Sequence, residues 1–126
     1  MRIRFFIVII ALLLWAIAGR TGEPIRIKDS EAIEYVGKEV EVRGRVVSVT
    51  TSPLGTTFIN FGGEYPHQTF AGFIAAGSTV TTDQRLTMIQ GKTISITDLI
   101  QFRDGKPEIE IVSANQIKGL DSPSER

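Results

Sequence analysis

The residues that most often carry catalysis are scarce in this chain. Among its 126 residues there is no cysteine and only one histidine, His67, and no G-x-S-x-G motif surrounds a serine. A serine triad needs an imidazole and a third group that orients it, and a metal site needs several ligands, yet Glu64 is the only carboxylate near His67 in the sequence. We therefore expect no catalytic residue, no metal site and no cofactor.

Two pairs of carboxylates are spaced by two residues. Glu39 and Glu41 form one pair, and Glu108 and Glu110 form the other. On a β-strand, residues at this spacing share one face. General acid and base catalysis would require such a pair to line a pocket. A solvated outer face carries the same pattern, and the alternation of Glu39 and Glu41 with Arg43 and Arg45 favours it for the first pair.

The amino terminus predicts export. Arg2 and Arg4 precede an apolar run from 5 to 18 that ends in the small residues Ala16 and Ala18. This is the pattern of a secretory signal peptide, here residues 1–18, with cleavage after Ala18. The run is shorter than the roughly 20 residues that span a bilayer as a helix. The alternative is an uncleaved anchor in the inner membrane, so we expect an exported protein, periplasmic or secreted.

The charge balance gives no general argument for a polyanionic partner. The whole chain has 14 basic and 14 acidic residues, and removal of Arg2 and Arg4 leaves 12 basic residues against 14 acidic ones. A mildly acidic domain disfavours strong binding to phosphates unless basic residues gather in a local patch.

The remaining chain alternates as β-strands do. After an extended lead-in over residues 19–29 we expect a short helix at 30–36 and then a long strand from residue 38, whose change of parity around Gly44 predicts a bulge or bend. Further strands are expected at 57–62, 69–75, 94–102 and 106–111. A short helix over 82–90 separates the third strand from the fourth, and the Asp104-Gly105 pair predicts a hairpin turn before the fifth.

This order predicts an all-β domain over residues 30–119, followed by a flexible tail at 120–126. Five strands, a bent first strand and a helix between strands three and four are typical of a five-stranded Greek-key OB-fold barrel. An SH3-like barrel is the nearest alternative, but it has no place for the helix at 82–90.

Several short motifs, in this order, resemble a known family. They are Tyr35-Val36-Gly37-Lys38, Val40 to Val46, Thr57-Phe58-Ile59-Asn60-Phe61-Gly62, Tyr65-Pro66-His67-Gln68-Thr69-Phe70, Gly91-Lys92 and Pro107-Glu108-Ile109. Together they are similar to small exported bacterial OB-fold domains of the tRNA-anticodon and helicase nucleic-acid-binding type, including those attached to secreted nucleases. The resemblance covers about residues 32–117 and supplies no catalytic residue. Asp98 stands where that family usually has a glycine.

The resemblance implies a non-enzymatic module that binds single-stranded DNA or RNA on its open face. If Ile59 and Phe61 face the core, their neighbours on the strand face outward. The candidate binding residues are Arg43, Arg45, Phe58, Asn60, Tyr65, Gln68 and Lys106. Aromatic side chains would stack on bases and basic ones would contact phosphates.

Two alternatives stay open. The aromatic residues Phe58, Phe70 and Phe73 could fill the core instead of stacking on bases. The domain could also bind an envelope protein, a peptide, an oligosaccharide or a small charged ligand without binding nucleic acid, and it would meet the membrane only through an uncleaved amino-terminal segment.

Overall fold

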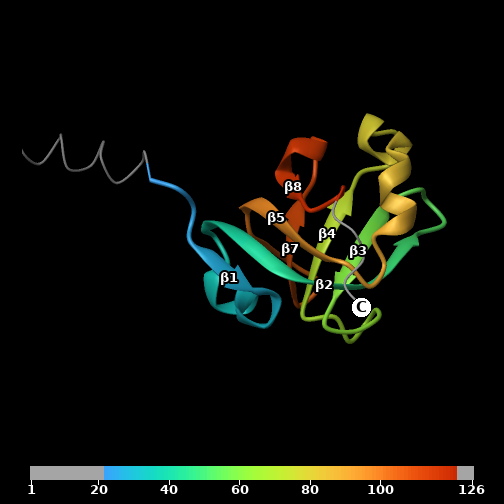
Figure 1. The fold of residues 1–126 in the computed structure, drawn as a ribbon. Helices are drawn as coiled ribbons and strands as arrows, with labels where there is room; N and C mark the ends of the chain where they lie inside the picture. The colour runs from blue at the N-terminus through green and yellow to red at the C-terminus, as the bar shows by residue number, and fades with distance from the viewer. Residues whose placement is uncertain (1–21, 122–126) are drawn as a thin grey trace, which may run out of the picture.

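Residues 22–121 form an all-β fold in a computed structural model of the protein (Figure 1). The predicted signal peptide at 1–18 and most of the predicted tail lie outside these described residues, although Leu120 is buried. In chain order the elements are β1 (Arg26–Lys28), the 3₁₀ helix η1 (Asp29–Tyr35), β2 (Glu39–Thr51), β3 (Thr57–Phe61), β4 (Phe70–Ile74), η2 (Thr79–Thr82), η3 (Gln84–Met88), β5 (Thr93–Leu99), β6 (Gln101–Arg103), β7 (Lys106–Glu110), η4 (Ala114–Gln116) and β8 (Ile117–Lys118).

One sheet contains every strand of this region. Its order is β6-β7-β4-β3-β2-β5-β8, and β1 pairs with β2 outside that path. The pairing of β4 with β7 is parallel, as is that of β1 with β2, and the other pairs are antiparallel. The all-β class is thus confirmed, whereas no pairing between described residues closes the sheet into the barrel that we expected.

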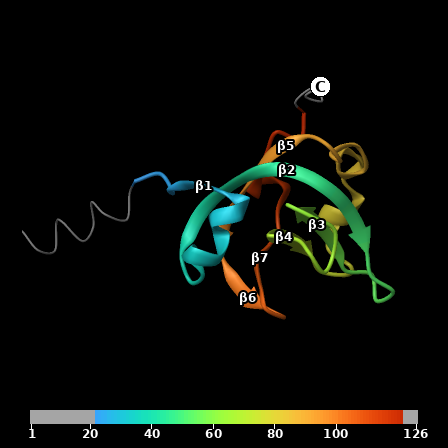
Figure 2. The same ribbon diagram turned by 90° about the horizontal axis from the view of Figure 1, so that it is seen from below.

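The long strand β2 joins the two parts of the sheet. Its first half pairs with β5 and its second half with β3, and Figure 2 shows it arching over the molecule. The pairing register with β3 shifts between Val46 and Ser48, so the predicted bulge is present at the point where the apolar parity changes, three residues after Gly44. Gly44 pairs regularly with Ile94.

Gly44 instead allows a close approach of η1 and β3. A Cβ atom at this position would lie 2.7 Å from Asp29 Oδ1 and 3.0 Å from the ring of Phe61. Gly72 on β4 has the same role on the core side, because a Cβ there would lie 2.7 Å from Ile96 Cδ1. The core between the strands is made of fully buried aliphatic and aromatic side chains, among them Ile59, Phe61, Phe70, Ile94, Ile96 and Ile109.

The two predicted helices are present as 3₁₀ turns. η1 covers Asp29–Tyr35, close to the predicted 30–36, and the predicted 82–90 helix is replaced by η2 and η3. Their caps are Ser78 and Asp83, whose side chains accept hydrogen bonds from Val80 N and Arg85 N.

The predicted fourth strand is interrupted at Ile100. β5 pairs regularly with β2 through Asp98 and ends at Leu99, and β6 turns to pair with β7. Phe102, at the end of the predicted strand, is 58% exposed. The hairpin turn is confirmed, because Asp104 and Gly105 both have positive φ, at 51° and 79°.

The expectation that Glu41 is solvated was wrong. Its side chain is 8% exposed and accepts hydrogen bonds from Arg26 Nε at 2.6 Å and Lys118 Nζ at 3.2 Å. Burial raises the pKa of Glu41, but hydrogen bonds from Arg26, Lys118 and Ser95 outweigh it and hold the pKa below its ordinary value of 4.5. This carboxylate therefore ties β1 and β8 to β2.

We expect Glu41→Gln to lower the free energy of unfolding at neutral pH by about 1 to 3 kcal/mol, the range for hydrogen bonds to a charged group. Because the folded-state pKa is lowered, the contribution of Glu41 is present above the ordinary value of 4.5 and is lost as the pH falls below it. Urea unfolding across this pH range measures both effects.

The matched control is Glu39→Gln, two residues earlier on the same strand, where the side chain is exposed. This change should alter stability by less than about 0.5 kcal/mol. Equal losses for the two variants would contradict a specific role for Glu41.

Candidate functional site

A groove of about 500 Å³ opens where three connections approach the sheet. The turn after β2 contributes Ser52 and Pro53, the β3–β4 loop contributes Tyr65 and Gln68, and the β6–β7 hairpin contributes residues on the opposite side. The lining residues lie on β2, β3 and β7 or on these connections. They are Thr50, Thr51, Ser52, Pro53, Phe58, Asn60, Tyr65, Gln68, Arg103, Asp104, Lys106 and Glu108.

The strand register explains why distant residues meet at the groove. Residues directly opposite each other in a sheet lie on the same face. One row runs across β2, β3, β4 and β7 through Ser48, Asn60, Ala71 and Glu108. The small side chain of Ala71 therefore separates Asn60 from Glu108.

The next row on this face is more aromatic. It runs through Thr50, Phe58, Phe73 and Glu110. Phe58 is half-buried and lines the groove, while Phe73 is 7% exposed and lies beneath Arg103, whose guanidinium carbon is 5.2 Å from the ring centroid. This cation–π contact holds Arg103 at the edge of the groove.

Three buried acceptor atoms of the groove have no hydrogen-bond partner. They are Asn60 Oδ1, Gln68 Oε1 and Glu108 Oε2, and their residues are 1%, 3% and 5% exposed. Asn60 Nδ2 is occupied, because it donates to Ser48 Oγ at 3.2 Å and Thr50 Oγ1 at 3.3 Å. Buried polar atoms without partners cost free energy, so their concentration at one groove makes it the candidate functional site.

Glu108 differs from the other charged residues that line the groove because its side chain is buried. Burial raises its pKa, the nearby charge of Arg103 opposes that effect and the charge of Asp104 adds to it, so the pKa lies above the ordinary 4.5. A buried carboxylate with a raised pKa beside a groove is a candidate functional group. The sequence left open whether Glu108 faces a pocket or solvent, and it lies buried in the lining of this groove.

Five of the seven predicted binding residues line this groove. Tyr65 is 74% exposed, and Phe58 and Lys106 are half-buried. Asn60 and Gln68 are buried at the groove. Arg43 and Arg45 are exposed and do not line it. They pair with Ser95 and Thr93 of β5, on the first half of β2, whereas the groove lies over its second half.

Glu108 and Arg103 line the groove but were not among the seven candidate binding residues. The spacing of Glu108 and Glu110 shows only that they share a face, and that face is covered at Glu108 and more open at Glu110. Arg103 precedes the Asp-Gly turn, so the hairpin signal could have placed it at a loop tip beside Lys106.

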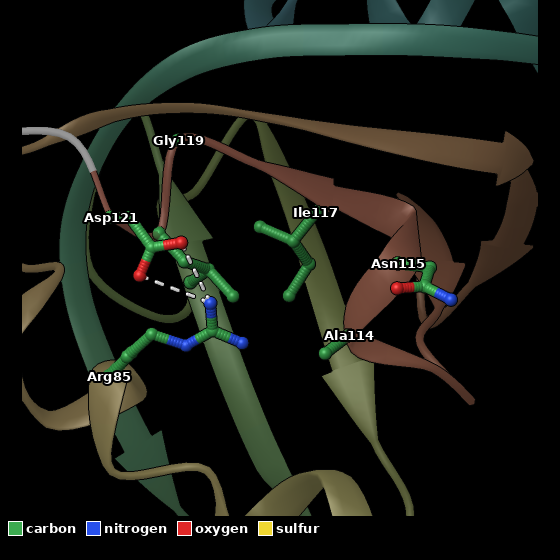
Figure 3. Close-up of a pocket in the computed structure, with 7 residues that line it drawn as sticks. Arg85, Ala114, Asn115, Ile117, Gly119 and Asp121 are labelled. Carbon is green, nitrogen blue, oxygen red and sulfur yellow. Dashed lines mark hydrogen bonds and ion pairs between the residues drawn. The ribbon is translucent and has the colours of Figure 1, made fainter.

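A second cavity differs in its chemistry. Figure 3 shows the side chain of Arg85, from η3, directed at Asp121. Arg85 Nη1 lies 3.0 Å from Asp121 Oδ2, and Arg85 Nη2 lies 2.7 Å from Asp83 Oδ2. Hydrogen bonds from Arg85 hold the pKa of Asp83 below its ordinary value. Arg85, Asp83 and Asp121 form ion pairs with one another. These charges are therefore already paired, unlike the unpartnered oxygens of the groove.

The described residues contain no group of three or more histidine, aspartate or glutamate side chains placed to hold a metal ion. Within residues 22–121, none of the helices has both the length and the apolar character needed to cross a bilayer.

Comparisons with known proteins do not assign a family. No protein-family model and no curated protein matches the chain. Among the solved structures that match, a crystal structure of a chain described as an aspartyl-tRNA synthetase from Leishmania major Friedlin aligns with a TM-score of 0.48 and 14% sequence identity. The alignment covers 75% of this chain and 20% of the synthetase chain, so this chain spans about one fifth of that protein.

We expect Glu108→Gln to raise the free energy of unfolding by about 1 kcal/mol at neutral pH, because it removes a buried charge whose oxygen lacks a partner. The raised folded-state pKa has a further consequence. Native Glu108 retains its proton where the unfolded chain has lost it, so its contribution to stability falls as the pH rises from 4.5 through the raised pKa.

Urea unfolding of both proteins over this interval should show that decline in the parent and a smaller one in Glu108→Gln. A variant less stable than the parent at neutral pH would mean that Glu108 has a stabilising partner in the folded protein.

Proposed function

We propose that this chain is an OB-type binding module whose groove binds single-stranded nucleic acid. The strand pairing supports the OB-type assignment: β2 pairs with both β3 and β5, and β4 pairs in parallel with β7. OB-folds bind oligonucleotides on the face of their second and third strands, between the loops that follow the first and fourth strands. In this chain those elements correspond to β3, β4, the turn at Ser52 and the β6–β7 hairpin.

The observation that carries the proposal is the presence of three kinds of group in one groove. Phe58 and Tyr65 offer aromatic faces, Arg103 and Lys106 offer positive charge, and three buried oxygens lack donors. A nucleotide has the complementary parts, namely a flat base, an anionic phosphate and N–H groups on the edge of the base.

The charge distribution limits how much strand is bound. Arg103 and Lys106 are the basic side chains that line the groove, and Asp104 lies between them in the turn. Lys92 does not add to this charge, because it is 9% exposed and its Nζ donates to the carbonyl oxygen of Leu120. We therefore propose contact with about two phosphates and a weak dependence on salt.

We also propose that the module binds its ligand without converting it. The chain has no cysteine, and its histidine lies in the β3–β4 loop outside the groove lining. The groove residues accordingly contain neither a thiol nor an imidazole for nucleophilic or acid–base catalysis.

An oligosaccharide of the cell envelope is the second candidate ligand. The separation of Arg43 and Arg45 from the groove favours it, as do the acidic residues Asp104 and Glu108 in the lining. Sugar hydroxyls could donate to the three free acceptors, and sugar faces could stack on Tyr65. Such binding would be insensitive to salt, which separates it from binding of nucleic acid.

Fluorescence anisotropy of labelled single-stranded DNA and RNA, titrated with the full chain at several salt concentrations, tests the proposal. We expect saturable binding with a slope of log K against log salt of about −1.4, the value for two phosphates on a single strand. Tyr65→Ala should weaken binding about tenfold through the loss of one stacked base.

Phe102→Ala is the matched control, since Phe102 is 58% exposed but does not line the groove, and it should leave the affinity unchanged. Absence of binding at low salt would exclude nucleic acid as the ligand.

We propose, finally, that the protein is exported by its amino-terminal segment. Mass spectrometry of the chain recovered from the envelope of a bacterial host should give a mature amino terminus at Gly19. A chain that begins at Met1 and sediments with the membrane would indicate the uncleaved anchor instead, and a chain recovered from the cytoplasm would contradict export.

A further inference from the structure

The groove has three unpartnered acceptor atoms among its buried lining residues. Asn60 Oδ1, Gln68 Oε1 and Glu108 Oε2 all lack donors, and the one side-chain amide nitrogen of Asn60 is committed to Ser48 and Thr50. The cations, in contrast, belong to the hairpin at the rim, where Arg103 is exposed and Lys106 is half-buried. A ligand group that satisfies these three oxygens must therefore supply hydrogen-bond donors to them.

The four bases differ in the donors that they present along the edge used for pairing. Adenine and cytosine each offer one amino group beside a ring nitrogen that accepts, and thymine or uracil offers one N–H between two carbonyls. Guanine alone offers two adjacent donors, N1–H and the N2 amino group, and its only acceptor on that edge is O6.

A carboxylate matches this pair of donors well. Its two oxygens can accept two parallel N–H bonds, and bonds to an ionised acceptor are the stronger kind. The amide oxygens of Asn60 and Gln68 remain available for the second hydrogen of the N2 amino group, and Arg103 or Lys106 can donate to O6. Adenine, cytosine or thymine would instead direct at least one of its own acceptors toward these oxygens.

We infer that the groove selects guanine among the bases of a single strand, with Glu108 accepting from N1–H and N2–H and with Asn60 and Gln68 as further acceptors. This inference rests on the proposed function, because it supposes that a base enters the groove. Glu108 then determines the specificity for guanine, and the stacking of Phe58 and Tyr65 supplies the affinity for the strand.

The deciding experiment compares two oligothymidylate probes that differ by one amino group. One carries a single central guanine, and the other carries hypoxanthine, which keeps O6 and N1–H but lacks the N2 amino group. Using anisotropy with the full chain, we expect the guanine probe to bind about tenfold more tightly, the discrimination typical of a lost bidentate contact. Probes with a central adenine or cytosine should bind no better than hypoxanthine.

Glu108→Gln should remove most of the preference for guanine, while Glu110→Gln should preserve it. Glu110 is the matched control because it lies two residues later on the same strand and does not line the groove. If Glu108→Gln does not fold, Gln68→Met provides the second variant, since it removes another acceptor, and it should reduce the preference several-fold.

The outcomes separate the inference from the proposed function. Equal affinity for guanine and hypoxanthine, with binding that still depends on Tyr65, would overturn the selection of guanine and leave the binding of single strands intact. A guanine preference that survives in both Glu108→Gln and Gln68→Met would also overturn it. Failure of every probe to bind would overturn the proposed function itself.

Discussion

The hydrogen-bond pairing of β2 is the constraint on which the rest of the fold depends. A single strand of 13 residues serves as the antiparallel partner of β5 over its first half and of β3 over its second half. Because the register shifts between Val46 and Ser48, the strand can bend and direct its two halves into different parts of the sheet. The groove lies over the second half, and the ion pairs of Glu41 lie on the first.

Two buried carboxylates of the described region show how differently the fold treats the same kind of residue. Glu41 is surrounded by donors, and its pKa is lowered despite burial. Glu108 is equally buried, has an oxygen without a partner, and its pKa is raised. Since isolated buried charge is costly, a fold selected only for stability would have no reason to keep Glu108. This contrast favours a role in binding.

The sequence was informative where local pattern decides structure. Alternation placed β3, β4 and β7 within a residue or two, and Asp104-Gly105 predicted the hairpin, because strand period and turn conformation depend on neighbouring residues. The sequence did not predict the features that depend on pairing between distant strands. Arg43 and Phe58 were expected on one surface, yet the bend in β2 separates the face of Arg43 from the groove. The burial of Glu41 follows from Arg26 and Lys118, which alternation cannot place.

The groove also explains why so mildly charged a domain could discriminate between ligands. Contacts to phosphate position a strand but carry little sequence information, whereas contacts to base edges specify it. This groove has two basic side chains at its rim and three unpartnered acceptors at its base. It is therefore better equipped to discriminate between bases than to attract the phosphates of a strand. The affinity for any single strand must therefore come largely from the stacking of Phe58 and Tyr65. The choice between strands comes from the buried oxygens, because the free-energy cost of leaving them unpartnered is offset only when a ligand supplies the correct donors.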